Sequence, residues 1–501
     1  MDYPVWNVPY LGGSMVIAVV AIIHVFIAHF AIGAGIVNAL TETFALRRNE
    51  PVLRQFLRDH SRLLIILAFI GGAVTGVGIW FSISLVSPDA TGLLIHLFLW
   101  AWAIEWIFFL VELAAAYIYY YTWDRLSPAA HCLVGWIYVL AALFTLVFIN
   151  GIVTFMLSPG TSLDSSVRPM QFDFWAGLFN PTYWPSLLLR TISSLAIVAL
   201  IIMVLVNASR RYSPQQRDLV VRHAGKFLLP LILMIPAAGW FFAASPEESV
   251  FYIKGGAIAM TLLFAFSLAA STLIGFFSYL AILIRKRSVN LETALLLLFI
   301  ALIATGSSEF VREGMRKPYL IWDHMYSNGL LKSQVASLQK PGKKFDTSIL
   351  RSTRWSIRPQ DAGEVPFTDE DFLTYNPAAL EKVKDTVRGR WIYDAQCLRC
   401  HCIDGYNGIR PLVYQWTPKM LVNALRELDK VKAFMPPFVG NQRDREDLAA
   451  FMHALNDPDK KTSPSCLGSG CHTLDTAQPV RPDTETSPDQ PNQPEETEDQ
   501  P

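Results

Sequence analysis

The sequence predicts an all-α protein: a polytopic bundle of about eight membrane-spanning helices, followed by a small helical domain outside the membrane. Composition gives the first reason, because 52% of the 501 residues are hydrophobic and only 17% are charged, which is too apolar for a soluble chain of this length. A succession of apolar windows over residues 1–315 gives the second. These windows indicate a lipid bilayer as partner, and the formal net charge of zero gives no sign of nucleic-acid binding.

Eight apolar windows, each long enough to cross a bilayer, define the expected spans. They cover residues 13–44, 62–87, 93–122, 130–157, 184–207, 227–245, 254–284 and 291–315. The first window is too long, and too poor in preceding basic residues, for a cleaved signal peptide. We therefore expect residues 1–315 to form one membrane domain.

Basic residues follow the first, fifth and seventh windows, whereas the alternate loops carry few cations. These residues are Arg47, Arg48, Arg54, Arg58 and Arg62, then Arg210, Arg211, Arg217, Arg222 and Lys226, then Arg285, Lys286 and Arg287. Because basic loops are retained in the cytoplasm, both chain ends are expected on the periplasmic side of a bacterial cytoplasmic (inner) membrane.

The run Cys397-Leu398-Arg399-Cys400-His401 has the C-x-x-C-H spacing of haem c attachment, in which two thiols form thioethers to the haem and the histidine ligates iron. Met435, in a proline-stiffened loop, is the expected sixth ligand. A helical stretch after this loop is apolar on one face, through Leu448, Phe451, Met452 and Leu455. In order and size, residues 378–456 resemble a class I cytochrome c. A zinc or disulfide loop would explain neither Met435 nor the closing helix.

Two further segments flank this domain. Residues 316–377, which are irregular and contain several prolines, are expected to be a periplasmic connector. Residues 457–501 are rich in proline and acidic residues and form a tail that cannot bury a core. The tail contains a C-x-x-x-x-C-H motif made by Cys466, Cys471 and His472. Its glycines favour a second haem c with His472 as iron ligand, and the alternative is a disulfide between the two cysteines.

Ionisable residues inside the expected spans are candidates for function, because charge in a helix centre is costly. They are His24, His29, His96, Glu105, Glu112, Arg190, Glu309, Arg312, Glu313 and Arg316. Glu105 and Glu112 are seven residues apart and share a helix face. Histidine and glutamate buried behind a haem c motif suggest further haems between the helices, and the alternative is a hydrogen-bond network without cofactor. We expect His29 and His96 to serve packing or hydrogen bonding.

Several of these residues lie in motifs through which residues 10–325 resemble subunit I of the cytochrome bd oxidases. The motifs are His24-Val25-Phe26-Ile27 with Gly33 and Glu42-Thr43, Ile104-Glu105 with Glu112 and Trp123-Asp124-Arg125-Leu126, Asn150-Gly151, Phe179-Asn180-Pro181, and Glu313-Gly314-Met315-Arg316-Lys317-Pro318-Tyr319. The last differs from the family pattern by Lys317 and Tyr319, where the family has Gln and Trp.

The resemblance implies roles for the matching residues. His24 is expected to ligate one high-spin haem, where oxygen binds, and Glu313 the second. Arg316 is expected to pair with a haem propionate. Glu105 is expected to face the haem pair, and Glu112 to belong to a proton route from the cytoplasm. These haems are expected to be of type b or d, and the ligands do not determine which of the two types is present.

The chain also departs from the family pattern. Arg190 stands where the family has the histidine ligand of a low-spin haem b, and Lys254-Gly255-Gly256 stands where the partner methionine is expected, with Met260 further on. The quinol-binding loop is reduced to residues 245–249, and a ninth helix is replaced by the haem c domain. We therefore expect neither low-spin haem b nor quinol oxidation, as in a cytochrome c-linked branch of the superfamily.

The resulting functional hypothesis is an oxidoreductase subunit of a respiratory chain. Electrons from a soluble periplasmic cytochrome c or another redox donor pass through haem c to the high-spin pair, where oxygen is reduced to water with cytoplasmic protons. Nitric oxide or peroxide are alternative substrates. An electron-transfer conduit without oxygen chemistry, and a haem-based sensor, are alternative functions. The resemblance also implies a second bd-type membrane subunit.

Overall fold

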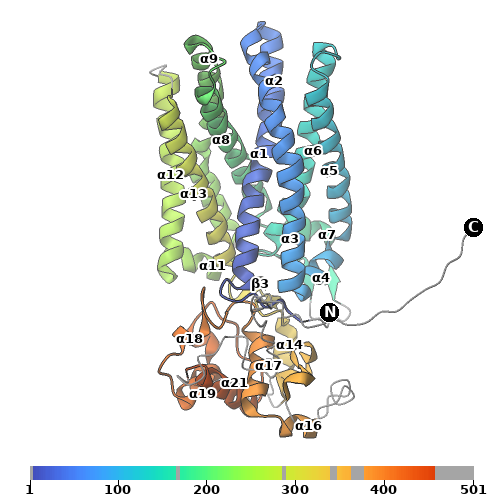
Figure 1. Cartoon of the computed structure of the whole chain (residues 1–501), viewed down its shortest axis with the longest axis vertical. Helices are drawn as coiled ribbons and strands as arrows, with labels where there is room; N and C mark the ends of the chain where they lie inside the picture. Colours follow the sequence, from blue (N-terminus) through green and yellow to red (C-terminus); the bar gives the residue numbers. More distant parts are fainter. Residues whose placement is uncertain (1–3, 165–169, 285–288, 339–346, 363–376, 457–501) are drawn as a thin grey trace, which may run out of the picture.

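The structure, a computed structural model, describes residues 4–164, 170–284, 289–338, 347–362 and 377–456. Figure 1 shows a long bundle of roughly parallel helices with a smaller helical domain against one end. The bundle contains the N-terminal helices, and the smaller domain contains the C-terminal ones. The tail motif of Cys466, Cys471 and His472, and the basic residues 285–287, lie outside the described residues.

Eight helices in the described part of the chain are long and apolar enough to cross a membrane, which confirms the predicted number of spans. They are α1 (Gly13–Arg48), α2–η1–α3 (Pro51–Ile65, Ile66–Gly72, Ala73–Val86), α5 (Leu99–Tyr121), α6 (Pro128–Phe155), α8 (Tyr183–Ala208), α9–η2–α10 (Pro214–Gly225, Lys226–Leu233, Met234–Ala244), α12 (Ile258–Ser278) with η4 (Tyr279–Ile284), and α13 (Leu291–Met315).

Two spans begin earlier than the apolar windows predict. The sixth starts at Pro214, where Ser213 forms a capping box with Gln216, so the basic segment before the apolar window is already helical. The second starts at Pro51, because the amphipathic α2 leads into the apolar part. Basic residues that the sequence suggested were in loops therefore lie on helical extensions.

The predicted start of the third span at residue 93 is wrong. A separate helix, α4 (Pro88–Leu97), ends there, and Phe98 has a non-helical backbone before α5 begins. The ring of Phe98 is fully buried, with its centroid 4.9 Å from that of Phe155 and 5.2 Å from that of Phe172. This aromatic cluster holds the chain where it turns, and His96 is exposed in the last turn of α4.

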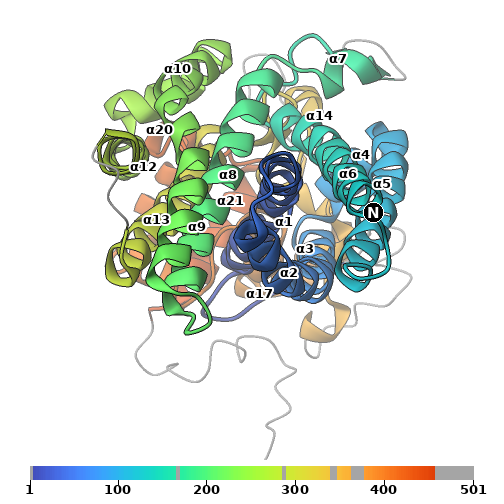
Figure 2. The same ribbon diagram turned by 90° about the horizontal axis from the view of Figure 1, so that it is seen from above.

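Helix α1 lies in the middle of the bundle, with α8 on one side and α3 and α6 on the other (Figure 2). Close packing against α8 depends on Gly33, since a Cβ there would lie 2.2 Å from the carbonyl oxygen of Ser194. The turn between α1 and α2 and the start of α9 lie at the end of the bundle opposite the small domain (Figure 1). The basic end and the domain therefore lie at opposite ends, as the predicted orientation requires.

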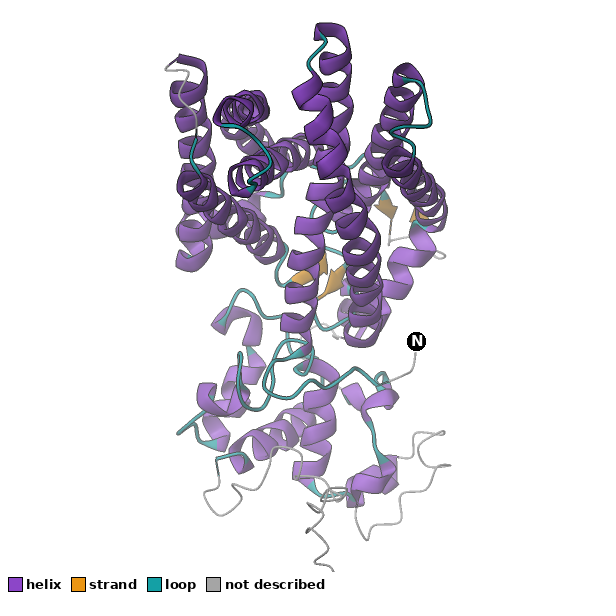
Figure 3. Cartoon of the chain, turned by 45° about the horizontal axis from the view of Figure 1, so that its top comes forward, coloured by secondary structure: helices purple, strands orange, loops and turns teal. Residues whose placement is uncertain are grey.

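Short elements connect the spans at the end that faces the domain. They are two antiparallel pairs, β1 (Leu163–Asp164) with β2 (Gln171–Phe172) and β3 (Tyr319–Ile321) with β4 (Met325–Tyr326), and the helices α7 (Phe174–Leu178), α11 (Glu247–Phe251), η3 (Tyr252–Gly256) and α14 (Lys332–Leu338). Figure 3 shows one strand pair near the centre, towards the domain, and the other at one side of the bundle. The expected irregular connector thus contains a small hairpin and short helices, including η5 (Ile349–Arg351), η6 (Arg354–Ser356) and η7 (Pro359–Ala362).

The small domain has the predicted order of helix, haem motif, methionine loop and closing helix. Its helices are α16 (Pro377–Lys382), α17 (Asp385–Gln396), α18 (Ile409–Leu412), α19 (Pro418–Arg426), α20 (Leu428–Val431) and α21 (Gln442–Ala454). Helix α17 crosses α21 at Gly389, where a Cβ would lie 2.0 Å from the carbonyl oxygen of Asp447. This contact needs glycine and fixes the crossing of the two main helices.

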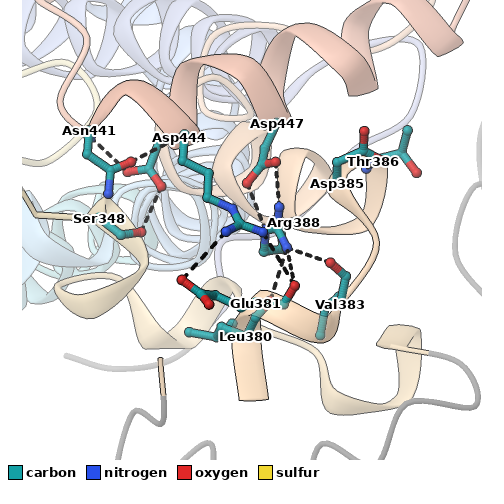
Figure 4. A network of polar contacts seen from close by, with 11 residues as sticks. Ser348, Leu380, Glu381, Val383, Asp385, Thr386, Arg388, Asn441, Asp444 and Asp447 are labelled. Carbon is teal, nitrogen blue, oxygen red and sulfur yellow. Dashed lines mark hydrogen bonds and ion pairs between the residues drawn. The ribbon is translucent and has the colours of Figure 1, made fainter. Parts of the chain in front are cut away.

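A buried polar network reinforces this crossing (Figure 4). Arg388 on α17 donates to both carboxylate oxygens of Asp447 on α21, at 2.7 and 2.6 Å, and to the carbonyl oxygens of Leu380 and Val383. Asp444, one helical turn earlier on α21, accepts hydrogen bonds from the Ser348 hydroxyl and the Ile349 backbone N–H, both at 2.8 Å. The connector is therefore attached to the closing helix of the domain.

Candidate haem-binding sites

The C-x-x-C-H motif forms the turn that follows α17. Cys397 and Cys400 are free, half-buried thiols. The Nδ1 atom of His401 lies 2.9 Å from the carbonyl oxygen of Asn407, and since a carbonyl only accepts, Nδ1 carries the proton. Burial lowers the pKa of His401, which favours the neutral ring. The Nε2 lone pair is then available to iron, with the ring oriented by a backbone carbonyl as in other metal-bound histidines.

The loop that carries Met435 is tied to the same helix. Gln396, directly before Cys397, donates through Nε2 to the carbonyl oxygen of Val439 at 2.8 Å and accepts from its N–H at 2.9 Å. The two thiols, the oriented histidine and a thioether on a fixed loop fit a covalent haem c with His401 and Met435 as ligands. Within the described residues, no group of three or more His, Cys, Asp or Glu side chains could hold a metal ion, so the zinc alternative gains no support.

The haem motif contacts the bundle directly. Arg399, between the two cysteines, forms an ion pair with Asp89 in the first turn of α4, and its side chain is only 4% exposed. The Tyr406 N–H donates to the carbonyl oxygen of Tyr10 at 2.7 Å. Gly405 makes this approach possible, because its φ is +92° and a Cβ there would lie 2.2 Å from the same oxygen.

The methionine loop contacts the bundle at a second place. The Tyr252 hydroxyl donates to the carbonyl oxygen of Ala433 at 3.2 Å. The rings of Tyr252 and Phe434 stack, with centroids 4.5 Å apart. Phe434 directly precedes Met435. Both loops that would flank a haem c therefore rest on the end of the membrane bundle.

His24 on α1 is oriented by a hydrogen bond to α3. Its Nδ1 lies 2.9 Å from the Thr75 hydroxyl of α3, and that hydroxyl donates its single proton to the carbonyl oxygen of Gly71 at 2.6 Å. The hydroxyl must therefore accept from Nδ1–H, which leaves the Nε2 lone pair free. Thr75 orients His24 as Asn407 orients His401, and sequence reasoning did not identify it.

Glu112 on α5 is buried, and Glu105 is half-buried one heptad earlier on the same helix. The Tyr138 hydroxyl lies 3.0 Å from Oε1 of Glu112 and 2.9 Å from the carbonyl oxygen of Ala31. In the described part of the chain, no hydrogen bond or ion pair joins His24, Glu105 and Glu313 directly.

Charged residues gather near the domain-facing end of α13. Glu309 pairs with Arg190 of α8 at 3.2 Å and with Arg312 at 2.9 Å. Glu313 pairs with Arg316 and, at 3.6 Å, with Lys317. The Glu313 side chain is 39% accessible, so it is less enclosed than Arg316, its partner in the ion pair.

Arg316 is more enclosed than the resemblance suggests. Its side chain is 8% exposed, and its guanidinium donates to the carbonyl oxygen of Leu320 at 2.9 Å as well as to Glu313. Its Nε lies buried without a partner among the described residues. A propionate could accept from that nitrogen after a small movement, so the residue fits the expected role only in part.

A cavity of about 160 Å³ lies between α8, α10, α12 and α13. Its lining includes His29, Arg190, Glu309 and Arg312. His29 donates from Nδ1 to the carbonyl oxygen of Val25 at 2.7 Å, as expected for a hydrogen-bonding residue. Arg190, at the position where the resemblance places a haem-ligating histidine, is instead paired with Glu309.

Met260 does not replace the methionine ligand that the resemblance leads one to expect. It is 3% exposed, and its sulfur lies against Gly314, where a Cβ would approach to 2.6 Å. Its thioether is therefore used in packing α12 against α13. The residues around this cavity do not fit a His/Met low-spin haem.

Comparisons with known proteins identify two parts of the chain. Residues 14–248 match the family model of cytochrome bd terminal oxidase subunit I, and residues 384–452 match that of cytochrome C oxidase, cbb3-type, subunit III. A solved bd oxidase from Geobacillus thermodenitrificans is similar in fold, with 18% sequence identity and a TM-score of 0.53 over 62% of this chain and 87% of that chain. No curated protein matches the chain. The protein is thus a multi-pass membrane oxidoreductase that carries a cytochrome bd subunit I domain in its N-terminal part and a cbb3-type cytochrome c domain in its C-terminal part.

Proposed function

We propose that this subunit passes electrons through a periplasmic haem c to a high-spin haem pair in the bundle, where O2 is reduced to water with cytoplasmic protons. The observation that carries the proposal is the attachment of both haem c loops to one end of the bundle, through Arg399–Asp89 and Tyr252–Phe434. A domain held in this way delivers its electrons into the bundle. The basic helix ends at the opposite end support a cytoplasmic source of protons.

Haem iron, when bound, supplies the one-electron chemistry and the site at which oxygen binds. His24, oriented by Thr75, would hold one high-spin haem, and Glu313 the second. Arg316 would contribute positive charge for a propionate. Each haem is of type b or d, since a histidine or carboxylate ligand is compatible with both.

Protons must reach the haem that binds oxygen, because each electron delivered to oxygen requires one proton. Glu105 faces the space beside the haem pair in this proposal, and Glu112 lies deeper in the bundle. Glu112 is hydrogen-bonded to Tyr138, so its carboxyl group is oriented by a group that can itself exchange a proton. The two carboxyl groups would serve as the last proton carriers before oxygen.

The electron donor is proposed to be a soluble periplasmic cytochrome c or another redox protein. The pairing of Arg190 with Glu309 supports the loss of low-spin haem b and of quinol oxidation. The tail motif of Cys466, Cys471 and His472 would hold a second haem c at the point of electron entry. A second bd-type membrane subunit is proposed to complete the enzyme.

Haem analysis of the purified full chain tests the proposal, by pyridine haemochrome and by spectra of the reduced protein with and without carbon monoxide. We expect haem c together with a high-spin b or d haem that binds carbon monoxide, and oxygen consumption with reduced cytochrome c. If the protein contains haem c alone, or haem c with a low-spin haem that does not bind carbon monoxide, oxygen reduction is excluded. The alternative function, an electron-transfer conduit, is then favoured. Nitric oxide and peroxide, offered in the same assay, would show whether either is the preferred substrate.

A further inference from the structure

A stripe of buried polar residues follows the interface of α1, α5 and α6. It begins near the basic end of the bundle, at Glu42 of α1 and His131 of α6, and reaches Tyr138 of α6 and Glu112 of α5, with Asn38 of α1 between them. None is more than 7% exposed, and Glu42 is 0% exposed. Because uncompensated polar groups inside a membrane are costly, such a continuous stripe indicates a function.

The first pair, Glu42 and His131, holds a proton by geometry alone. Nε2 of His131 lies 2.8 Å from the carbonyl oxygen of Tyr119, which only accepts, so Nε2 carries a hydrogen. Nδ1 lies 2.7 Å from Oε1 of Glu42. A lone pair on both atoms would be repulsive, so one proton lies between them, on the imidazole or on the carboxyl group.

The second pair, Tyr138 and Glu112, is arranged in a similar way. The Tyr138 hydroxyl has one proton and faces two oxygens, the carbonyl of Ala31 and Oε1 of Glu112. If Glu112 is protonated, its carboxyl group donates to the Tyr138 hydroxyl, which donates in turn to the Ala31 carbonyl, and all three groups are hydrogen-bonded. If Glu112 is ionised, the single hydroxyl proton can reach only one of the two acceptors, the carbonyl or the carboxylate. Gly35 permits this arrangement, since a Cβ there would lie 2.2 Å from the Tyr138 ring.

Asn38 lies between the two pairs. It is 2% exposed, and neither its amide nitrogen nor its amide oxygen has a partner among the described residues. Glu42 lies one helical turn, or about 6 Å, away along α1. Its Oε2 makes no hydrogen bond of normal geometry among the described residues, although the buried Tyr119 hydroxyl lies close enough to interact with this carboxyl group. Buried polar groups of this kind are satisfied by ordered water, and an amide can both donate to and accept from it.

We infer that the stripe is the proton-entry route of the enzyme: a proton enters at Glu42–His131, passes by way of Asn38 and ordered water to Tyr138–Glu112, and continues to Glu105. The inference rests on the proposed function, in which a reduced c-type cytochrome supplies the electrons and oxygen accepts them. One proton leaves the first pair for each electron that reaches oxygen, and one from the cytoplasm replaces it. No residue of the stripe changes its redox state.

Other side chains surround the Glu42–His131 pair. The Trp123 ring packs on His131, with centroids 4.0 Å apart, and the Thr43 hydroxyl lies 3.3 Å from the Cys132 sulfur beside it. Arg54 of α2 lies close enough to Tyr119 to act on its hydroxyl electrostatically, and the Nε of Arg54 lies buried without a partner among the described residues.

The test uses the purified full chain with its co-purifying subunits, in the variants Glu42→Gln and Asn38→Leu. Thr41→Val is the matched control, because Thr41 is equally buried on α1 but bonds to His223 on another side of the helix. Asn38→Asp is a conservative variant that retains a group able to exchange protons with water. For every variant we would measure haem content, oxygen turnover, reduction of the bundle haems without oxygen, and proton uptake upon that reduction.

We expect Glu42→Gln and Asn38→Leu to lower oxygen turnover about a hundredfold or more, the scale of a lost proton-transfer group. Haem content and the rate of electron transfer from haem c should match those of Thr41→Val, and Asn38→Asp should restore most turnover. Full turnover in both variants would overturn the route while leaving the proposed function intact. A wild-type enzyme that consumes no oxygen would overturn the proposed function. The route would still be tested in that case, because unchanged proton uptake on haem reduction in Glu42→Gln would overturn it.

Discussion

Arg399 and Asp89 form an ion pair between the haem c motif and the first turn of α4 in the bundle. The Arg399 guanidinium also lies against Gly329 of the connector, where a Cβ would approach Nη1 to 2.0 Å. The motif is thus held by contacts from two other parts of the chain. A cytochrome domain on a flexible linker would make no such contacts.

Asp89→Asn should slow electron transfer from haem c to the bundle haems by roughly tenfold, because breaking a buried ion pair costs about 3–5 kcal/mol and leaves Arg399 buried without its partner. Reduction of haem c itself by a small reductant should not change. The measurement is stopped-flow absorbance of the two haem types. Asp323→Asn, which breaks the exposed pair with Lys332, is the control and should have no effect.

Gln396→Ala should weaken ligation by Met435. The substitution removes two hydrogen bonds to Val439, each worth about 1 kcal/mol, and so frees the methionine loop. We expect a weaker sulfur-to-iron charge-transfer band and a lower reduction potential of haem c. Gln442→Ala, at the exposed start of α21, should change neither, and an unaltered band in Gln396→Ala would contradict the positioning role.

Asp444 gives the cytochrome domain a predicted pH dependence of stability. Burial raises the pKa of Asp444 from 3.8 to about 6, although its hydrogen bonds from Ile349 and Ser348 oppose this. Between pH 3.8 and about 6, Asp444 is ionised in the unfolded chain but still protonated in the folded one. The stability that Asp444 contributes is therefore largest below pH 3.8 and is lost as pH rises to about 6. The loss amounts to about 3 kcal/mol.

Thermal unfolding followed at the haem c absorbance, from pH 4 to about 7, checks this prediction. Asp444→Asn should flatten the dependence in that window, because the amide does not titrate. Asp429→Asn, at an exposed position on α20, serves as the control and should leave it unchanged. A wild-type domain whose stability rises across this range would show that hydrogen bonding outweighs burial at Asp444.

Thr75→Val should impair haem binding at His24. Without the hydroxyl, Nδ1–H of His24 loses its acceptor, and loss of such an orienting group typically costs about 10–100-fold in metal affinity. We expect less carbon-monoxide-binding haem per chain. Ser278→Ala removes a similar buried hydroxyl on α12, bonded only to its own helix, and should retain full haem content.

The spans could be predicted from sequence because every backbone group in a bilayer must be satisfied within its own helix, which imposes long apolar windows. Their ends could not, since Ser213 caps a helix that starts in a basic segment and Phe98 turns the chain through tertiary contacts with Phe155. The haem c motif was predictable because its ligands are close in sequence. Its attachment to Asp89 was not, because those residues are 310 positions apart.

Within the bundle, the sequence could identify candidate site residues only where an ionisable side chain interrupts an apolar window. That rule, with the family resemblance, identified His24, Glu105, Glu112 and Glu313, whose roles no comparison tests. The same rule would have identified Glu42 and His131, which also lie within expected windows. Thr75, Gln396 and Tyr138 carry no such signal, because their importance comes only from the partner that the fold brings to them.

The most direct test of the account is a single-turnover reaction of the fully reduced enzyme with oxygen, started by photolysis of its carbon monoxide complex. We predict that the haem that releases carbon monoxide reacts first and that haem c is then oxidised in the same turnover, more slowly in Asp89→Asn. If haem c stays reduced while the bundle haem reacts, or if no haem in the bundle binds carbon monoxide, electrons do not follow the proposed path.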